Sequence, residues 1–301
     1  MVKDLREKTA AGMMDCKKAL TECDGDMEKA VDWLRQKGLS KAAKKAGRAT
    51  SEGLVGFELA ADGKSGVAVE VKCETDFVAR GDKFQGFVKD MVAQVAKGEY
   101  ADSEALLAAP FVADASVTVK EALDGVIATT GENMGLGKFA KMELAAGKSG
   151  LIGGYLHSNG KLAVLVEMQT GSDAAAASEA FHEVAKNVAM QIAAMSPKYW
   201  DKSQVPQADV DHELQVQVAL MDNDPKMANK PAAVKEKIAA GKMAAFYKES
   251  CLLQQEFVRS DLYKGDVAGY IADAAKKLGG KVTFVDAIHY VKGEGIEKKA
   301  D

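Results

Sequence analysis

Cysteine and histidine are scarce in this sequence, and neither residue type forms a cluster. The chain of 301 residues contains four of each, namely Cys16, Cys23, Cys73, Cys251, His157, His182, His212 and His289. Their spacing matches neither a metal site nor a redox CxxC motif. Isolated thiols are typical of the reducing cytoplasm. The sequence therefore predicts a cytoplasmic protein without a metal site.

A strong excess of charge and a long apolar run are also missing. The 40 basic residues nearly balance the 44 acidic ones, which gives a formal net charge of −4. No global field therefore attracts the chain to nucleic acid or to a membrane surface. No apolar stretch approaches the roughly 20 residues of a membrane span, and the first residues have no signal-peptide core. We expect neither nucleic acid nor membrane as a partner.

Phosphate-binding and catalytic motifs are absent as well. A P-loop needs a glycine, four further residues and then Gly-Lys-Ser or Gly-Lys-Thr, because its successive N–H groups cradle a phosphate. The three candidate Gly-Lys pairs have Glu58, Glu132 and Met142 in place of the first glycine. No GxSxG elbow occurs, and strand alternation predicts that Glu70 and Glu74 are solvated carboxylates. We therefore expect no enzyme, no cofactor and no direct nucleotide binding.

The most informative stretch that is present is Thr75-Asp76-Phe77-Val78. Residues 67–75 before it alternate between apolar and mostly polar side chains, as in a half-buried strand. After it, apolar residues recur at helical spacing and predict one buried face, formed by Phe84, Phe87, Val88, Met91, Val92 and Val95. From these residues alone, two interpretations stay open. Either Asp76 satisfies local N–H groups and Phe77 packs in the core, or the pair projects into a partner.

The chain also repeats itself without a gap when residue n is aligned with residue n + 97. Aligned pairs include Gly53 and Gly150, Gly56 and Gly153, Asp76 and Asp173, and Gln94 and Gln191. Farther on the register becomes 148, because Gly131 aligns with Gly279. The second copy therefore has a net insertion of 51 residues (148 − 97 = 51), which maps to about 197–261.

The repeat predicts an α+β fold with two related modules, residues 53–146 and 147–291. Each has a three-stranded antiparallel sheet packed by helices, with hairpin turns at Asp62-Gly63 and Asn159-Gly160. The third strands are expected at about 134–144 and 281–291. The insertion at 197–261 reads as two antiparallel helices that form a coiled-coil arm. Its predicted apolar stripes are Val210, Leu214, Val218 and Met221, then Val234, Ile238 and Ala245.

Residues 1–38 predict a small three-helix docking domain. Asp26 is placed to cap the third helix, and Gly38 is a suitable C-terminal stop. A basic segment follows at 39–52, with Lys41, Lys44, Lys45 and Arg48 among alanines. This segment is either a solvated linker or a strip that meets an acidic surface or RNA. Residues 292–301 read as a tail.

Two signatures and three supporting motifs closely resemble the bacterial elongation factor Ts family over essentially the whole chain. The signatures are "GMMDCKKAL" at residues 12–20 and "TDFV" at 75–78. The supporting motifs are "GENM", "YLH" and "GEGIEK". The resemblance implies a guanine-nucleotide exchange factor that binds elongation factor Tu in its GDP-bound and nucleotide-free states. It also implies that the N-terminal bundle is UBA-like.

The resemblance further implies which residues meet the partner. Met13 and Met14 would dock the N-terminal domain, His157 would contact the partner from the second module, and Thr75–Val78 would disturb the Mg²⁺ and phosphate site. The repeat adds that Asp76 is retained as Asp173 whereas Phe77 aligns with Ala174. We infer that the aspartate has a shared structural role and the phenylalanine a functional one. The alternative function is RNA or ribosome binding through the basic segment Arg35–Arg48.

Overall fold

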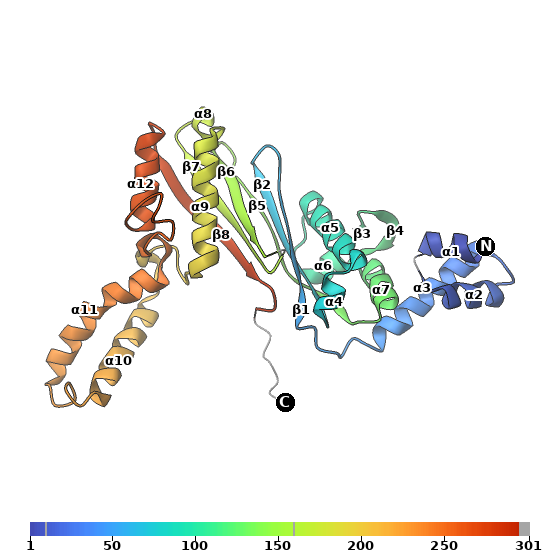
Figure 1. The fold of residues 1–301 in the computed structure, drawn as a ribbon, viewed down its shortest axis with the longest axis horizontal. Helices are drawn as coiled ribbons and strands as arrows, with labels where there is room; N and C mark the ends of the chain where they lie inside the picture. The colour runs from blue at the N-terminus through green and yellow to red at the C-terminus, as the bar shows by residue number, and fades with distance from the viewer. Residues whose placement is uncertain (10, 159, 295–301) are drawn as a thin grey trace. The chain divides into compact units, whose positions relative to one another are not determined.

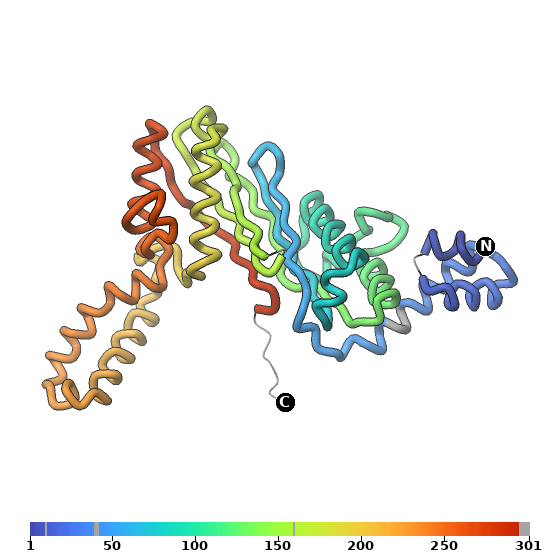
Figure 2. Tube along the Cα trace, viewed as in Figure 1, coloured from blue at the N-terminus to red at the C-terminus, as the bar shows by residue number. Residues whose placement is uncertain are grey.

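The computed structural model describes residues 1–9, 11–158 and 160–294, which divide into two compact units (Figures 1 and 2). The first unit contains the described parts of 1–142, 156–163 and 290–301, and the second contains 143–155 and 164–289. Helices and small antiparallel sheets confirm the predicted α+β class. The finer domain boundaries given above stay predictions.

Three helices open the first unit: α1 (Val2–Thr9), α2 (Met13–Glu22) and α3 (Met27–Ala43). They share a small core that includes Leu5, Cys16 and Ala30. Asp26 caps α3 as predicted, because its Oδ1 accepts hydrogen bonds from the N–H groups of residues 28 and 29 at 3.1 Å. The prediction that Gly38 ends this helix is wrong. The helix continues through good helix formers to Ala43, and the buried Ala42 joins the core of the first sheet.

The first sheet has the order β1-β2-β5, from β1 (Glu52–Leu59), β2 (Ser65–Cys73) and β5 (Met134–Glu143). Helix α5 (Asp82–Lys97) packs on β1 and β2, and all six apolar residues predicted for its buried face are buried. The remaining elements of this module are α4 (Asp76–Ala79), α6 (Ser103–Ala108), β3 (Pro110–Phe111), β4 (Asp114–Thr118) and α7 (Val119–Thr130). The turn at Asp62-Gly63 is confirmed by a φ of 67° at the glycine.

The second sheet repeats this arrangement with the order β6-β7-β8. Its strands are β6 (Gly150–His157), β7 (Leu162–Thr170) and β8 (Val282–Val291), and its helices are α8 (Asp173–Ala176), α9 (Glu179–Met195) and α12 (Val267–Lys277). The predicted turn residue Asn159 lies outside the described residues. The third strands β5 and β8 end within a residue of the predicted positions, which confirms the two-register repeat.

Matched residues explain why the two modules pack alike. A side chain at Gly56 would meet Val88 and Val92 of α5 at 2.8 and 2.5 Å, and one at Gly153 would meet Ala185 of α9 at 2.6 Å. Both positions therefore need glycine so that the helix can approach the sheet closely. Two aligned glutamines are also buried in the same role. Gln94 Oε1 accepts from the Val112 N–H at 2.6 Å, and Gln191 Oε1 accepts from the Val258 N–H at 2.9 Å.

The insertion forms a helical arm from α10 (Gln207–Asn223) and α11 (Ala232–Ser250), flanked by the short helices η1 (Lys202–Gln204) and η2 (Leu252–Gln254). Met221 of α10 is buried in the seam as predicted. On α11 the prediction is partly wrong, since Val234 and Ala245 are exposed whereas Ala239 and Met243 are buried. The two buried residues lie four positions apart and share one helix face.

Candidate functional site

Helix α4 is a single turn that presents Phe77 to solvent. Thr75 is its N-cap, with an extended backbone and a side-chain oxygen that accepts from the Val78 N–H at 3.4 Å. Ala79 is buried on the inner side of the turn, whereas Phe77 is 84% exposed. A phenylalanine this exposed contributes little to the core. Of the two interpretations that the sequence left open, the structure therefore contradicts the buried one.

Glu132 holds the start of this turn in place. Its Oε1 accepts from the Thr75 hydroxyl at 2.6 Å, and its Oε2 accepts from the Thr75 N–H at 3.0 Å. Glu132 follows Gly131, which ends α7 in the left-handed conformation with a φ of 82°. Hydrogen bonds to an ionised acceptor are stronger than neutral ones. A carboxylate 57 positions away therefore fixes the segment that carries Phe77.

Glu74 forms a second set of hydrogen bonds between the segment before α4 and the loop that contains Glu132. Its Oε1 accepts from the Asn133 N–H and lies 3.5 Å from the Arg48 guanidinium. The Asn133 side chain in turn donates to the Arg48 carbonyl at 2.7 Å. The expectation of a fully solvated Glu74 is thus wrong, because the carboxylate is half-buried and bonded within the fold. The turn before α4 is tied to the loop before β5 from both sides.

Asp76 is the first residue of α4 and lies 3.0 Å from the Arg80 guanidinium, one turn later. Acidic side chains are favourable at a helix start. In the second module, Asp173 likewise begins α8, and Ser172 is its N-cap. The aligned aspartates therefore share a position in a capped turn, which supports the inferred structural role. Ala174 stands in that second turn where Phe77 stands in the first.

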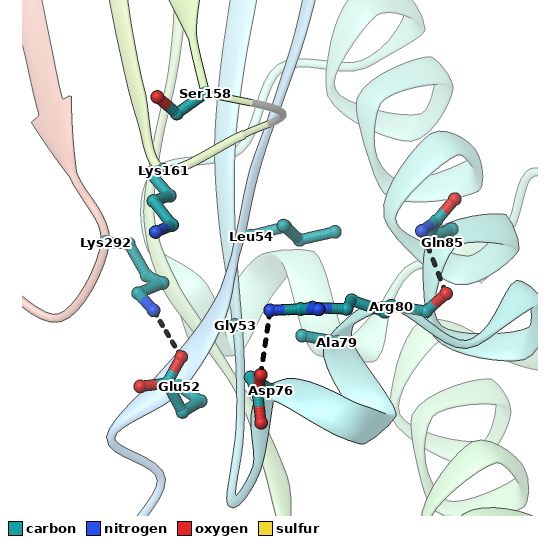
Figure 3. Close-up of a pocket in the computed structure, with 10 residues that line it drawn as sticks. All are labelled: Glu52, Gly53, Leu54, Asp76, Ala79, Arg80, Gln85, Ser158, Lys161 and Lys292. Carbon is teal, nitrogen blue, oxygen red and sulfur yellow. Dashed lines mark hydrogen bonds and ion pairs between the residues drawn. The ribbon is translucent and has the colours of Figure 1, made fainter.

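A cavity of about 700 Å³ lies beside α4 in the first unit (Figure 3). In this view Lys161 and Lys292 lie on one side of β1, and Asp76 and Arg80 on the other. Lys292 pairs with Glu52, as Arg80 does with Asp76. Four of the five charged groups that line the cavity are thus already paired with one another. The cavity is therefore a recess beside α4 whose charge is largely balanced by its own side chains.

Glu70 is buried and binds the segment that follows β8 within the first unit. Only 5% exposed, it accepts from the Gly293 N–H at 2.8 Å and from the Lys138 N–H at 3.3 Å. The prediction of a solvated carboxylate at this position is wrong, because a segment distant in sequence covers this face of the strand. Lys292 N–H also donates to the Lys161 carbonyl at 2.9 Å. Lys292 is held in this way where it lines the cavity beside α4.

Met13 and Met14 begin α2 and are 59% and 74% exposed. Neither belongs to the small core of the N-terminal helices, to which α2 contributes Cys16, Ala19 and Leu20. The bundle itself is attached to α7, since α3 packs on that helix and Arg35 pairs with Glu121. Exposed methionines form adaptable contact surfaces. They are not part of the cavity beside α4.

His157 is the last residue of β6 and is exposed. Its carbonyl accepts from the Lys161 N–H at 3.1 Å, and the neighbouring Ser158 lines the cavity beside α4. Ser158 and Lys161, which follow His157, therefore line the same recess as Asp76. The structure brings the two predicted positions, His157 and Asp76, into one region of the first unit.

The two arginines of the basic segment Arg35–Arg48 each lie beside a carboxylate. Arg35 pairs with Glu121, and Arg48 lies beside Glu74. The Glu121 carboxylate also accepts from the Thr118 N–H, and this bond, followed by Arg35, lowers the pKa of Glu121. The side chain of Lys41 lies outside the described residues.

Metal binding and membrane insertion are two further kinds of function to consider. Within residues 1–9, 11–158 and 160–294, no group of three or more histidine, cysteine, aspartate or glutamate side chains is arranged to hold a metal ion. Across those same ranges, no helix combines the length and apolar character needed to cross a membrane. Burial raises the pKa of the Cys73 thiol to about 12, so this cysteine beside Thr75 is not a ready nucleophile.

Sequence reasoning did not find the contacts of Glu132 and Glu70 with these segments. Glu132 lies within "GENM", a motif noted for its resemblance but not for any contact. Glu70 aligns with Glu167 in the n + 97 register, and both are buried in the structure. Neither pattern reveals the residues that the carboxylates bind.

Comparison with known proteins gives one consistent result. A family model described as Elongation factor TS matches residues 74–294, more than half of the chain. The Elongation factor Ts of Nitratidesulfovibrio vulgaris (strain DP4) is 49% identical over 98% of this chain and 95% of that protein. The Elongation factor Ts of Lawsonia intracellularis (strain PHE/MN1-00) is 45% identical over 98% of each chain. That of Clostridium novyi (strain NT) is 42% identical over 100% of this chain and 94% of that protein.

Proposed function

The chain belongs to the elongation factor Ts family, and from this premise we propose that it is a guanine-nucleotide exchange factor for elongation factor Tu. It acts in the cytoplasm by binding, not as an enzyme, and it takes up Tu in the GDP-bound and nucleotide-free states. It needs no cofactor of its own. The observation that carries this proposal is Phe77, which is 84% exposed on a turn held by Glu132.

Phe77 acts as a wedge in this proposal. A large apolar ring on a fixed backbone can enter a partner's surface at little cost in conformational freedom. Asp76 accompanies it and places a carboxylate beside the polar contacts that hold Mg²⁺ and the phosphates in Tu. The two hydrogen bonds that Thr75 donates to Glu132 hold Asp76 and Phe77 in position while the partner's elements move. GDP release follows from the loss of those Mg²⁺ and phosphate contacts.

Thermodynamic linkage sets what the interface must supply. If the exchange factor lowers the affinity of Tu for GDP n-fold, GDP lowers the affinity of Tu for the exchange factor n-fold as well. A 10⁴-fold weakening corresponds to about 5.5 kcal/mol of differential binding, more than one side chain ordinarily provides. Met13 and Met14 on α2 and His157 at the end of β6 therefore act as further contacts in the proposal.

The test is the release of a fluorescent GDP analogue from purified Tu, followed by stopped flow. Addition of the chain at a concentration equal to that of Tu should accelerate release by orders of magnitude. Release at the spontaneous rate would refute the proposal. RNA binding is the alternative function, and an affinity for RNA that falls steeply with salt would support it. The pairing of Arg35 and Arg48 with carboxylates argues against it.

A further inference from the structure

The arm formed by α10 and α11 is fixed at both ends. At its base, the Tyr199 hydroxyl donates to Asp209, and the N–H groups of residues 198 and 199 donate to the Ser250 carbonyl at 2.9 and 3.0 Å. At its tip, the buried Lys235 pairs with Asp222 and donates to the Ala228 carbonyl at 2.7 Å. Two helices held at both ends keep a constant spacing, so the surface between them is formed before any partner arrives.

A groove of about 660 Å³ runs along one flank of this arm. Its lining combines apolar side chains, rich in alanine, with polar and mostly acidic ones. The apolar residues, which we call the floor, are Leu214, Val218, Ala219, Ala239 and Ala240, and the polar residues are Asp211, Gln215, Asp222 and Glu236. The α10 members recur at intervals of three and four residues, which places them on one helix face.

The shape of the groove fits a third helix. The α10 members extend from Asp211 to Asp222, about three turns or 17 Å of helix at 1.5 Å per residue. Alanines at 219, 239 and 240 let another helix come close, because they fill little of the space between the axes. A hairpin of two helices leaves this flank open, and a third helix packed along it would complete a small bundle.

The charge of the groove selects the chemistry of that helix. Lys235 already neutralises Asp222. Asp211 accepts a hydrogen bond from the Gln207 side chain at 2.8 Å, and neither Asp211 nor Glu236 has an ion pair within the part of the chain that the structure describes. Two carboxylates beside an apolar floor attract lysine or arginine and repel phosphate. A nucleic acid therefore does not fit, whereas a cationic helix does.

We propose that this groove is a docking site for an amphipathic helix of another protein, about three turns long, with an apolar face flanked by lysine or arginine. The helix packs its apolar face on the alanine-rich floor and places its cations beside Asp211 and Glu236. This site lies on the arm and is independent of the exchange activity proposed for α4. The arm thereby gains a binding function of its own.

The test uses the full chain and two designed peptides of 16 residues that share one leucine and alanine face. One peptide has lysine at the flanking positions and the other has glutamate, and both carry a fluorophore for anisotropy at low salt. The lysine peptide should bind saturably and the glutamate peptide should not. Ala240→Glu should weaken binding by about tenfold or more, because it places a bulky charge on the groove floor. Ala245→Glu is the matched control on the same helix, since Ala245 is exposed but does not line the groove, and should change nothing.

Glu236→Lys reverses the charge of one carboxylate that lines the groove. It should weaken binding of the lysine peptide by roughly threefold to tenfold and allow the glutamate peptide to bind. The proposal is overturned if the lysine peptide does not bind, or if Ala240→Glu and Ala245→Glu weaken it equally. Light scattering of the free chain adds another outcome. A dimer that Ala240→Glu dissociates would assign the groove to a second copy of this chain and would also overturn the proposal.

Discussion

Replacement of Phe77 by alanine should reduce nucleotide exchange strongly while leaving the fold intact. The ring is 84% exposed, so about a sixth of its surface is covered in the free chain. A phenylalanine side chain can bury about 200 Å², and the covered part is therefore about 30 Å². At about 25 cal/mol per Å², its loss costs roughly 0.8 kcal/mol of unfolding free energy. For a unit of this size, that corresponds to a fall in melting temperature of about 2–3 °C.

The Phe77 ring should bury much more surface in the complex with Tu than in the free chain. If the partner covers the remaining surface, about 170 Å², the gain approaches 4 kcal/mol. Truncation of a central aromatic residue in an interface commonly costs 2–4 kcal/mol. We therefore expect Phe77→Ala to lower kcat/KM for GDP release by about 30-fold to 1000-fold. Phe77→Leu retains part of the apolar bulk, so its kcat/KM should lie between the values of the wild type and of Phe77→Ala.

The assay pairs stopped-flow GDP release with thermal melting followed by circular dichroism. Phe84→Ala is the matched control, because Phe84 lies seven positions later and is fully buried. Its removal should cost about 3–5 kcal/mol of stability. The reasoning fails if Phe77→Ala melts as early as Phe84→Ala, since the ring would then belong to the core. It also fails if Phe77→Ala exchanges nucleotide at the wild-type rate.

Three further predictions concern the supports of the site. Glu132→Ala should lower both the rate of GDP release and the melting temperature, because Thr75, at the start of the turn that carries Phe77, loses two hydrogen bonds to the Glu132 carboxylate. A wild-type rate of GDP release would contradict this. The double variant Met13→Ala and Met14→Ala should raise the KM for Tu with a melting temperature near that of the wild type, since both side chains are exposed. Glu121→Gln should destabilise the docking of α3 on α7 at neutral pH. The pKa of Glu121 is lowered in the fold, so this advantage of the wild type should be full above the ordinary glutamate pKa and should vanish as the pH falls through the lowered value. Melting curves at pH 7 and about pH 3 check this, and a constant difference would contradict it.

Local sequence patterns predicted the architecture, because helix faces, helix caps and tight turns each depend on only a few neighbouring residues. The face of α5, the cap of α3 and the turn at Asp62-Gly63 follow from helical spacing, capping and turn chemistry. The repeat also predicted that the two modules have equivalent sheets, and it aligned Gln94 with Gln191, which are both buried. Comparison of the two copies also singled out Phe77 as an aromatic residue with no counterpart in the second module.

The errors concern residues whose environment depends on distant segments. Alternation placed Glu70 on a polar face, but it is buried and accepts a hydrogen bond from the Gly293 N–H, 223 positions away. Gly38 was expected to stop α3, but the packing of Ala42 extends the helix. In the arm, local spacing on α11 favoured Val234, whereas Ala239 faces α10. No local rule carries information about which segment will lie opposite a residue.

The measurement that tests the central claim most directly is the Mg²⁺ dependence of GDP release from Tu by the wild type and by Phe77→Ala. If Phe77 and Asp76 act by disturbing the Mg²⁺ and phosphate site, the wild type should exceed the variant most at millimolar Mg²⁺. Chelation of Mg²⁺ should bring their rates together, because the contact that the wedge disturbs is then already lost. A deficit of Phe77→Ala that stays the same with and without Mg²⁺ would show that Phe77 contributes only to binding, and would contradict the account.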